Sequence, residues 1–267
     1  MDIVSNAQER ELKLKLRLAQ LEKNEFSQNS FLSFVKTVWP DFIAGRHHKI
    51  IADKLERVAK GELKRLIINM APRHTKSEFA SYLFPAWMMG RNPKMKIIQA
   101  THTTELAVNF GRKTKNLIDS DEYKEIFPEV KLAADSKASG RWDTSKGGMY
   151  YAVGVGSNLA GRGGDLVVID DPHSEQTAMS VNGFEDAWDW YTGGPRQRLQ
   201  PGGSIVLVQT RWSEKDMTGQ LLRAMSKDPL ADQWEVVELP AIFEDGKPCW
   251  PEYWSLEDLT AVKASIP

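Results

Sequence analysis

Short apolar runs alternate with segments of helical spacing over most of the chain, and this alternation predicts the fold. Five runs of four to six residues, rich in Ile, Val and Leu, match buried strands at 65–69, 96–100, 166–169, 204–209 and 235–239. Helical spacing is found at 77–89, 104–117, 182–190 and 214–225. Strands that alternate with helices form a parallel sheet with helices on both faces. We therefore predict an α/β fold with a mostly parallel sheet.

Two local patterns add detail to this prediction. The segments 142–144 and 149–153 are joined by a turn with two consecutive glycines, which is typical of a hairpin. Ser213 and Asp216 have the spacing of a capping box. We expect this pair to start the helix at 214–225.

The beginning of the chain predicts a separate helix. Residues 6–25 are rich in Glu, Lys, Leu, Gln and Ala, a composition that favours helix. Leu14, Leu18 and Leu21 would lie on one stripe of it. We expect this stripe to pack on the chain's own domain, and docking onto a partner subunit is the alternative.

Composition limits the class of protein. The chain has 35 Lys and Arg against 36 Asp and Glu, a formal net charge of -1, so any contact with DNA must come from a local patch. The single cysteine, Cys249, excludes a disulfide framework and suits a reducing cytoplasm. No apolar run approaches the roughly 18 residues of a membrane span, so we expect no membrane partner.

Two carboxylates end the apolar run at 166–169. Asp170 and Asp171 follow it directly, and in a parallel sheet ligands bind outside the carboxyl ends of the strands. Two adjacent acids at such a position repel each other unless a cation neutralises them. A solvated turn after a core strand is the alternative that this segment alone leaves open.

A Lys-Ser pair follows the first predicted strand after a short loop. Strand, loop, Lys-Ser and helix form the layout of a phosphate-binding loop, in which backbone N–H groups surround phosphates, Lys reaches the β- and γ-phosphates and Ser binds Mg²⁺. Met70 and Thr75 occupy positions where the standard pattern has glycine, and a β-branched residue is strained at positive φ. Together with the diacid strand, this loop predicts a site for ATP and Mg²⁺.

Each residue of these two motifs has a predicted role. Ser77 and Asp170 would bind Mg²⁺, and Asp171 would act on the attacking water. Glu175 is a second candidate for the base if the side chain of Asp171 is too short. The loop residues assigned to ATP binding are Arg73, His74, Thr75, Lys76 and Ser77.

Three segments resemble, in this order, the large terminase subunit of tailed bacteriophages. They are Pro72 to Glu78, Gly161 to Asp165 with the diacid strand that follows, and Val208 to Trp212. That family is the ATP-driven motor that packs viral DNA into preformed capsids. The resemblance covers roughly residues 31–240, and it differs at Asp171, where many members carry a catalytic Glu.

The resemblance implies more than the residues show by themselves. It implies a P-loop NTPase architecture of the RecA/ASCE type, and double-stranded DNA, a portal protein and a small terminase subunit as partners. It also implies a homo-oligomeric ring on the procapsid, in the cytoplasm of a host bacterium. The Thr-Arg-Trp segment is similar to the family's coupling motif, so Thr210 would sense hydrolysis of the γ-phosphate; a strand-ending Thr that caps a turn is the alternative.

Four arginines and a histidine pair complete the candidates. Arg162 lies in a glycine-flanked loop and would serve a neighbouring subunit as an arginine finger, unless it is solvated. Arg73, acting within its own site, is the competing candidate. Arg196 and Arg198 form a small basic patch that would touch DNA phosphates or remain solvated. His47-His48 lies where terminases and helicases place adenine contacts, so we expect His48 at the base, or else a surface pair.

The resemblance also divides the chain. Residues 1–30 would form the N-terminal helix, 31–245 the ATPase domain, and 246–267 an extension toward a nuclease domain that this chain lacks. We expect a Mg²⁺-dependent ATP hydrolase without nuclease activity. A helicase-like nucleic-acid ATPase and a catalytically weak nucleotide-binding scaffold are the alternatives.

Overall fold

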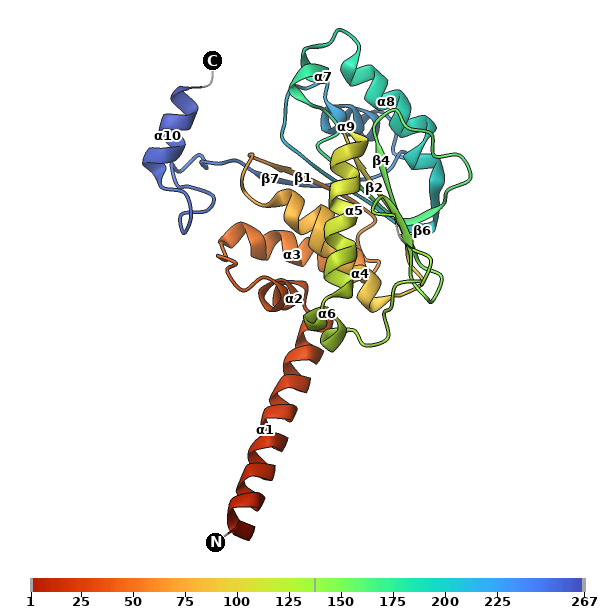
Figure 1. Ribbon diagram of the computed structural model, residues 1–267. Helices are drawn as coiled ribbons and strands as arrows, with labels where there is room; N and C mark the ends of the chain where they lie inside the picture. Colours follow the sequence, from red (N-terminus) through yellow and green to blue (C-terminus); the bar gives the residue numbers. More distant parts are fainter. Residues whose placement is uncertain (1, 137, 266–267) are drawn as a thin grey trace.

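The computed structural model describes residues 2–136 and 138–265, and in these residues seven strands form one sheet in the order β3-β4-β2-β5-β6-β1-β7 (Figure 1). All neighbouring strands are parallel except β3 and β4, which form an antiparallel hairpin. The five predicted strands and the hairpin are confirmed. The strands are β1 (Arg65–Met70), β2 (Lys96–Thr101), β3 (Arg141–Asp143), β4 (Met149–Gly154), β5 (Gly164–Asp170), β6 (Leu199–Gln209) and β7 (Glu235–Leu239).

Helices cover both faces of the sheet, as the alternation predicts (Figure 1). They are α1 (Asp2–Asn29), α2 (Phe31–Val38), α3 (Arg46–Ala59), α4 (Phe84–Arg91), α5 (Thr104–Asp119), α6 (Asp121–Ile126), α7 (Glu175–Met179), α8 (Gly183–Gly193), α9 (Met217–Lys227) and α10 (Leu256–Ala264). A π-helical segment, η1 (Glu78–Leu83), precedes α4, and a 3-10 helix, η2 (Pro195–Arg198), precedes β6.

The period of two along each strand divides the core between the two faces. Leu66 and Ile68 of β1 pack among α2 to α6, whereas Ile67 packs among α8 and α9. Because β1, β5 and the second half of β6 are buried on both faces, their central runs 66–68, 166–169 and 205–208 are continuously apolar rather than alternating. The polar groups that follow these strands therefore lie at the edge of the sheet.

The position of α1 differs from the prediction. The helix projects from the rest of the chain, and only about its last three turns contact the domain, through bonds such as Asn24 Nδ2 to the Glu125 carbonyl (Figure 1). Leu14, Leu18 and Leu21 are exposed. The expectation that this stripe packs on its own domain is wrong, because the side chains lie beyond the reach of the core.

Two other details correct or extend the sequence analysis. Helix α9 begins at Met217, and its cap is Asp216, whose carboxylate accepts the Gly219 N–H at 3.0 Å. Ser213 is therefore not the capping residue. In the segment 246–267, Cys249 is buried in the core, so the beginning of this extension packs on the sheet-containing body. Among the described residues, no helix is long and apolar enough to cross a membrane.

Candidate functional site

The carboxyl ends of β1, β5 and β6 meet at one edge of the sheet, since β6 lies between the other two strands. A cavity of about 550 Å³ opens at this edge. Lys76 from the loop after β1, Asp171 after β5 and Thr210 after β6 line it, and Glu175 lies at its exposed margin. Segments that are more than ninety residues apart in sequence are thus brought together, as in the bond from Ser77 Oγ to Asp170 Oδ1.

The loop after β1 turns through left-handed backbone without any glycine. Arg73 has φ 62° and Thr75 has φ 67°. Position 75 is the one where the standard pattern has glycine, and the observed φ explains why. Outside contacts hold both residues: Trp254 Nε1 donates to the Arg73 carbonyl at 3.4 Å, and the Thr75 hydroxyl lies 2.7 Å from His48 Nε2.

Lys76 is buried, and its charge is paired within the site. Its Nζ lies 2.9 Å from Asp171 Oδ2 and donates to Thr210 Oγ1 at 3.1 Å. A buried ammonium requires such partners, because its desolvation is otherwise costly. The amine is therefore held at the floor of the cavity, between the ends of β5 and β6.

Asp170 is buried and bound by two hydroxyl groups. Ser77 Oγ donates to Oδ1 at 3.0 Å, and Ser81 Oγ donates to Oδ2 at 2.7 Å. Burial, and next the charge of Asp171, raise the pKa of Asp170 to about 7. The Ser77 hydroxyl and the Asp170 carboxylate are hard oxygen donors of the kind that Mg²⁺ prefers, and Mg²⁺ commonly takes one or two protein carboxylates beside substrate phosphates.

Asp171 has a strained backbone and an engaged carboxylate. Its φ is 41°, and its Oδ1 accepts the Thr210 N–H at 2.7 Å while Oδ2 contacts Lys76. Its carbonyl lies 3.1 Å from His102 Nδ1, which donates to it. The turn therefore aims the carboxylate along the sheet edge toward the neighbouring strand end.

The arginine candidates are not drawn into the cavity of their own chain. Arg162 places its guanidinium 4.4 Å from the centre of the Tyr151 ring, and neither it nor the exposed Arg73 lines the cavity. Arg196 is bound by Asp232 through Nε and a terminal nitrogen, so one half of the predicted basic patch is already neutralised. The structure does not bring these groups together with Lys76.

The histidine pair is buried, so the expectation of a surface pair is wrong. His47 and His48 are 1% and 0% exposed, and their rings lie 3.7 Å apart. Burial, and then the neighbouring histidines, lower the pKa of His48 to about 2 and that of His47 to about 4. Both ring nitrogens of His48 have protein partners, which leaves none to offer to a nucleotide base.

Sequence reasoning missed two cavity-lining histidines. His102 follows β2, the neighbour of β5, and His173 follows Asp171 after one proline. His173 Nε2 accepts the Met217 N–H at 2.9 Å, so its proton is on Nδ1. The signal that could have found both residues is their position directly after adjacent strands of the sheet.

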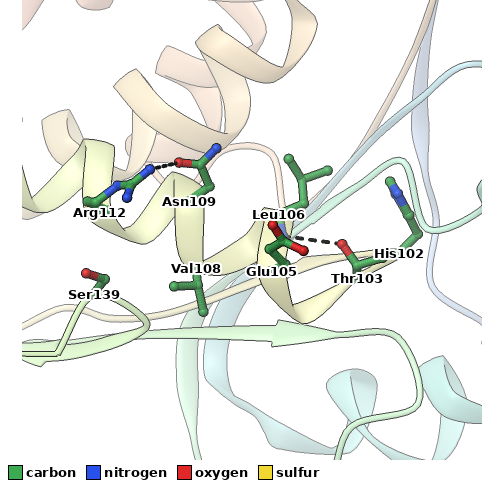
Figure 2. Close-up of a pocket in the computed structure, with 8 residues that line it drawn as sticks. All are labelled: His102, Thr103, Glu105, Leu106, Val108, Asn109, Arg112 and Ser139. Carbon is green, nitrogen blue, oxygen red and sulfur yellow. Dashed lines mark hydrogen bonds between the residues drawn. The ribbon is translucent and has the colours of Figure 1, made fainter.

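A second, polar cavity adjoins the first along α5. It has a volume of about 430 Å³, and His102 and Thr103 line both cavities. Figure 2 shows Asn109 and Arg112 on α5, where Arg112 donates to Asn109 Oδ1 at 2.6 Å, and Ser139 on the loop that faces them. The candidate site thus continues into a groove that carries both donors and acceptors.

The fold is an α/β architecture with a mostly parallel seven-stranded sheet and helices on both faces, as predicted. Solved structures similar to this chain include large terminases of bacteriophages. The HK97 large terminase has a TM-score of 0.60 at 12% identity, covering 89% of this chain and 51% of that one. The ATPase domain of the Thermus phage P74-26 large terminase, in a mutant form, has a TM-score of 0.49 at 14% identity, covering 79% and 88%. The large terminase of a thermophilic bacteriophage has a TM-score of 0.48 at 13% identity, covering 80% and 50%.

The likeness to the HK97 protein confirms the predicted resemblance at the level of the fold. The chain spans about half the length of that large terminase. No protein-family model and no curated protein matches the sequence. The likeness therefore describes architecture, and the chemistry rests on the residues of the site itself.

Proposed function

We propose that this chain is the ATPase motor domain of a terminase, which hydrolyses ATP with Mg²⁺ to move double-stranded DNA into a procapsid. The observation that carries the proposal is the convergence of Lys76, Asp170, Asp171 and Thr210 at one sheet edge. It occurs in a fold similar to the HK97 large terminase. The motifs of the sequence point to the same four positions independently of the geometry.

Lys76 would bind the β- and γ-phosphates. Phosphate oxygens in the cavity would compete with Asp171 for Lys76 Nζ, since a triphosphate carries more negative charge than one carboxylate. The move of the amine to the phosphates would release Asp171 to orient and deprotonate the attacking water. The ion pair would thus prevent Asp171 from acting until ATP arrives.

Ser77 and Asp170 would bind the Mg²⁺, which neutralises charge on the phosphates when bound. A cation beside Asp170 favours its ionised form, and so offsets the burial that raises its pKa to about 7. The loop residues Arg73, His74 and Thr75 would surround the phosphates with their backbone. We assign no base contact to His48.

The remaining roles concern catalysis and coupling. Asp171 is our first candidate for the base, and Glu175, at the exposed margin of the cavity, is the second. Arg162 would act on a neighbouring subunit, and Arg73 is the alternative within the chain. Thr210 contacts both Lys76 and Asp171. Loss of the γ-phosphate would change these two contacts, and the end of β6 would transmit this change to α9.

The proposal includes an assembly. A homo-oligomeric ring on a portal protein, with a small terminase subunit and double-stranded DNA, would work in the cytoplasm of a host bacterium. The exposed margin of the cavity supports a subunit contact at this edge, and the position of Arg162 outside its own site leaves its guanidinium to another subunit.

The test is ATP hydrolysis with and without Mg²⁺ for the parent and Lys76→Ala. We expect the variant to lose turnover and to bind ATP more weakly, because among the described residues no other lysine or arginine lines the cavity. Lys49→Ala, which removes an exposed lysine of α3, is the matched control and should hydrolyse ATP like the parent. Turnover by Lys76→Ala at the parental rate would refute the assignment.

Two outcomes would favour the alternatives. A parent that binds ATP without hydrolysing it under any assembly condition would support the nucleotide-binding scaffold. Stimulation by single-stranded but not double-stranded nucleic acid would support the helicase-like ATPase.

A further inference from the structure

The phosphate loop contains a conformation that its sequence does not favour. Thr75 has φ 67°, in the left-handed region where β-branched residues are rare, because their second Cβ substituent meets the backbone. Glycine adopts this conformation freely. A loop with threonine at this position therefore requires contacts from outside to stabilise it.

Such a contact comes from α3. Gly45 N–H donates to His48 Nδ1 at 2.8 Å, and since a backbone N–H can only donate, this nitrogen carries no proton. The proton of the neutral ring is then on Nε2, which donates to Thr75 Oγ1 at 2.7 Å. The hydroxyl in turn donates to the His74 carbonyl at 2.6 Å. Every donor and acceptor in this chain of bonds is determined.

The His48 ring has little freedom to leave this position. It is 0% exposed, stacked on Phe79 at 4.9 Å between ring centres, and enclosed by the rings of Phe42 at 4.6 Å and Trp250 at 5.0 Å. The lowered pKa of His48, about 2, keeps the ring neutral over the working range of pH. The donor that faces Thr75 is therefore permanent.

Gly45 makes the arrangement possible. A Cβ added at this residue would lie 2.6 Å from Trp250 Cδ1 and 2.9 Å from the His47 ring. Only a residue without a side chain lets the backbone N–H approach His48 so closely. The phosphate loop itself has no glycine, but the contact that stabilises it depends on Gly45, which lies just before α3.

We propose that His48 is a positioning residue that holds the phosphate loop in its ATP-binding conformation through the Thr75 hydroxyl. The pair would replace the conformational freedom of the usual glycine by a fixed hydrogen bond. The loop N–H groups would then be aimed at the phosphates before ATP arrives. The inference rests on the proposed function because its first test measures ATP affinity, whereas the hydrogen bonds behind it do not depend on that function.

The experiment is a double-mutant cycle on ATP affinity. Thr75→Val keeps the branched shape but removes the hydroxyl, and His48→Phe keeps a ring but removes the donor. Each should weaken ATP binding by about tenfold, the size expected when one buried donor or acceptor loses its partner. Thr75→Ser, which keeps the hydroxyl, should bind ATP like the parent.

The decisive comparison uses glycine. In the Thr75→Gly background, the loop no longer needs the bond, so His48→Phe should change ATP affinity by less than about twofold. An equal loss in both backgrounds would overturn the proposal, because His48 would then act only on the general stability of the fold. If His48→Phe does not fold, Thr75→Val against Thr75→Ser still decides the matter: equal affinities would refute the role of the hydroxyl.

A second measurement separates this inference from the proposed function. Hydrogen exchange of the Phe79 amide, whose N–H donates to the Thr75 carbonyl at 3.1 Å, should accelerate in Thr75→Val and His48→Phe, whether or not the parent binds ATP. A parent without ATP affinity but with this acceleration would refute the proposed function and keep the His48 inference. Unchanged exchange together with normal ATP binding would refute the His48 inference and keep the proposed function.

Discussion

Asp170 provides a test of the site that does not depend on turnover. Its carboxyl group is buried beside Asp171, and its pKa rises from the ordinary value of 3.8 to about 7. A folded state that binds a proton more tightly than the unfolded state loses stability as the pH rises between the two pKa values. Asp170 should therefore cost nothing below pH 3.8 and its full penalty above pH 7.

The size of the penalty follows from the pKa. At roughly 1.36 kcal/mol per pH unit, the rise corresponds to about 4 kcal/mol at pH 8, and to about 2 kcal/mol at pH 5. Asp170→Asn removes the ionisation and can keep both neighbours, since its carbonyl accepts from Ser77 and its amide donates to the Ser81 hydroxyl. We expect the variant to be more stable than the parent at pH 8, by roughly 2–3 kcal/mol more than at pH 5.

The assay is urea unfolding of both proteins at pH 5 and pH 8, in the presence of a chelator. Asp53→Asn, at an exposed carboxylate of α3 with 67% side-chain exposure, is the control and should show no such difference between the two values. Addition of ATP and Mg²⁺ at pH 8 should stabilise the parent and not Asp170→Asn. If Asp170→Asn is equally destabilised at both pH values, Asp170 is ionised and stabilised by its hydrogen bonds to Ser77 and Ser81. That result would refute the proposed cost of burying its charge.

Three further predictions concern the reaction. Asp171→Asn should bind ATP and lose hydrolysis by a factor of about 10²–10⁴, whereas Asp171→Glu should keep or raise activity. If Asp171→Asn is active and Glu175→Gln is inactive in the same phosphate-release assay, the base is Glu175. Thr75→Gly should bind ATP at least as well as the parent in a titration, and a clear loss would mean that glycine cannot replace the hydrogen bond between His48 and the Thr75 hydroxyl. Arg162→Ala mixed with Asp171→Asn under assembly conditions should recover part of the hydrolysis rate, because some interfaces then hold both intact residues; if a confirmed assembly of the two variants stays inactive, Arg73 becomes the better candidate for the finger.

The candidate site was predictable where its chemistry lies next to a strong local signal. Asp170 and Asp171 follow a continuous apolar run, and Lys76-Ser77 follows another, so each could be placed at a strand end without coordinates. Ser81 could not be found in this way, and His102 could be placed at a strand end but not beside the diacid strand. Ser81 reaches Asp170 only because η1 turns it inward, and His102 lies at the cavity only because β2 is the neighbour of β5.

The same division applies to the histidines and to α1. A pattern of polar residues predicts a surface, and on this basis a solvated pair was the alternative for His47 and His48. The packing of Trp250 and Phe79 around them, from segments more than thirty residues away, puts them in the interior. In α1 the reverse holds, since the leucines that suggest a buried stripe are exposed in the part of the chain that the structure describes.

Periodicity, β-branched runs and strand-end chemistry act over a few neighbouring residues, so the sequence alone predicts the strands, about half of the helices and the candidate motifs at the strand ends. Only the tertiary structure decided which strand lies beside which, that Lys76 pairs with Asp171, and that His48 holds Thr75. The contact between His48 and Thr75 joins residues 27 positions apart, and the one between Lys76 and Asp171 joins residues 95 positions apart. Their energies depend on burial and on the direction of single side chains, and neither is encoded in local sequence spacing.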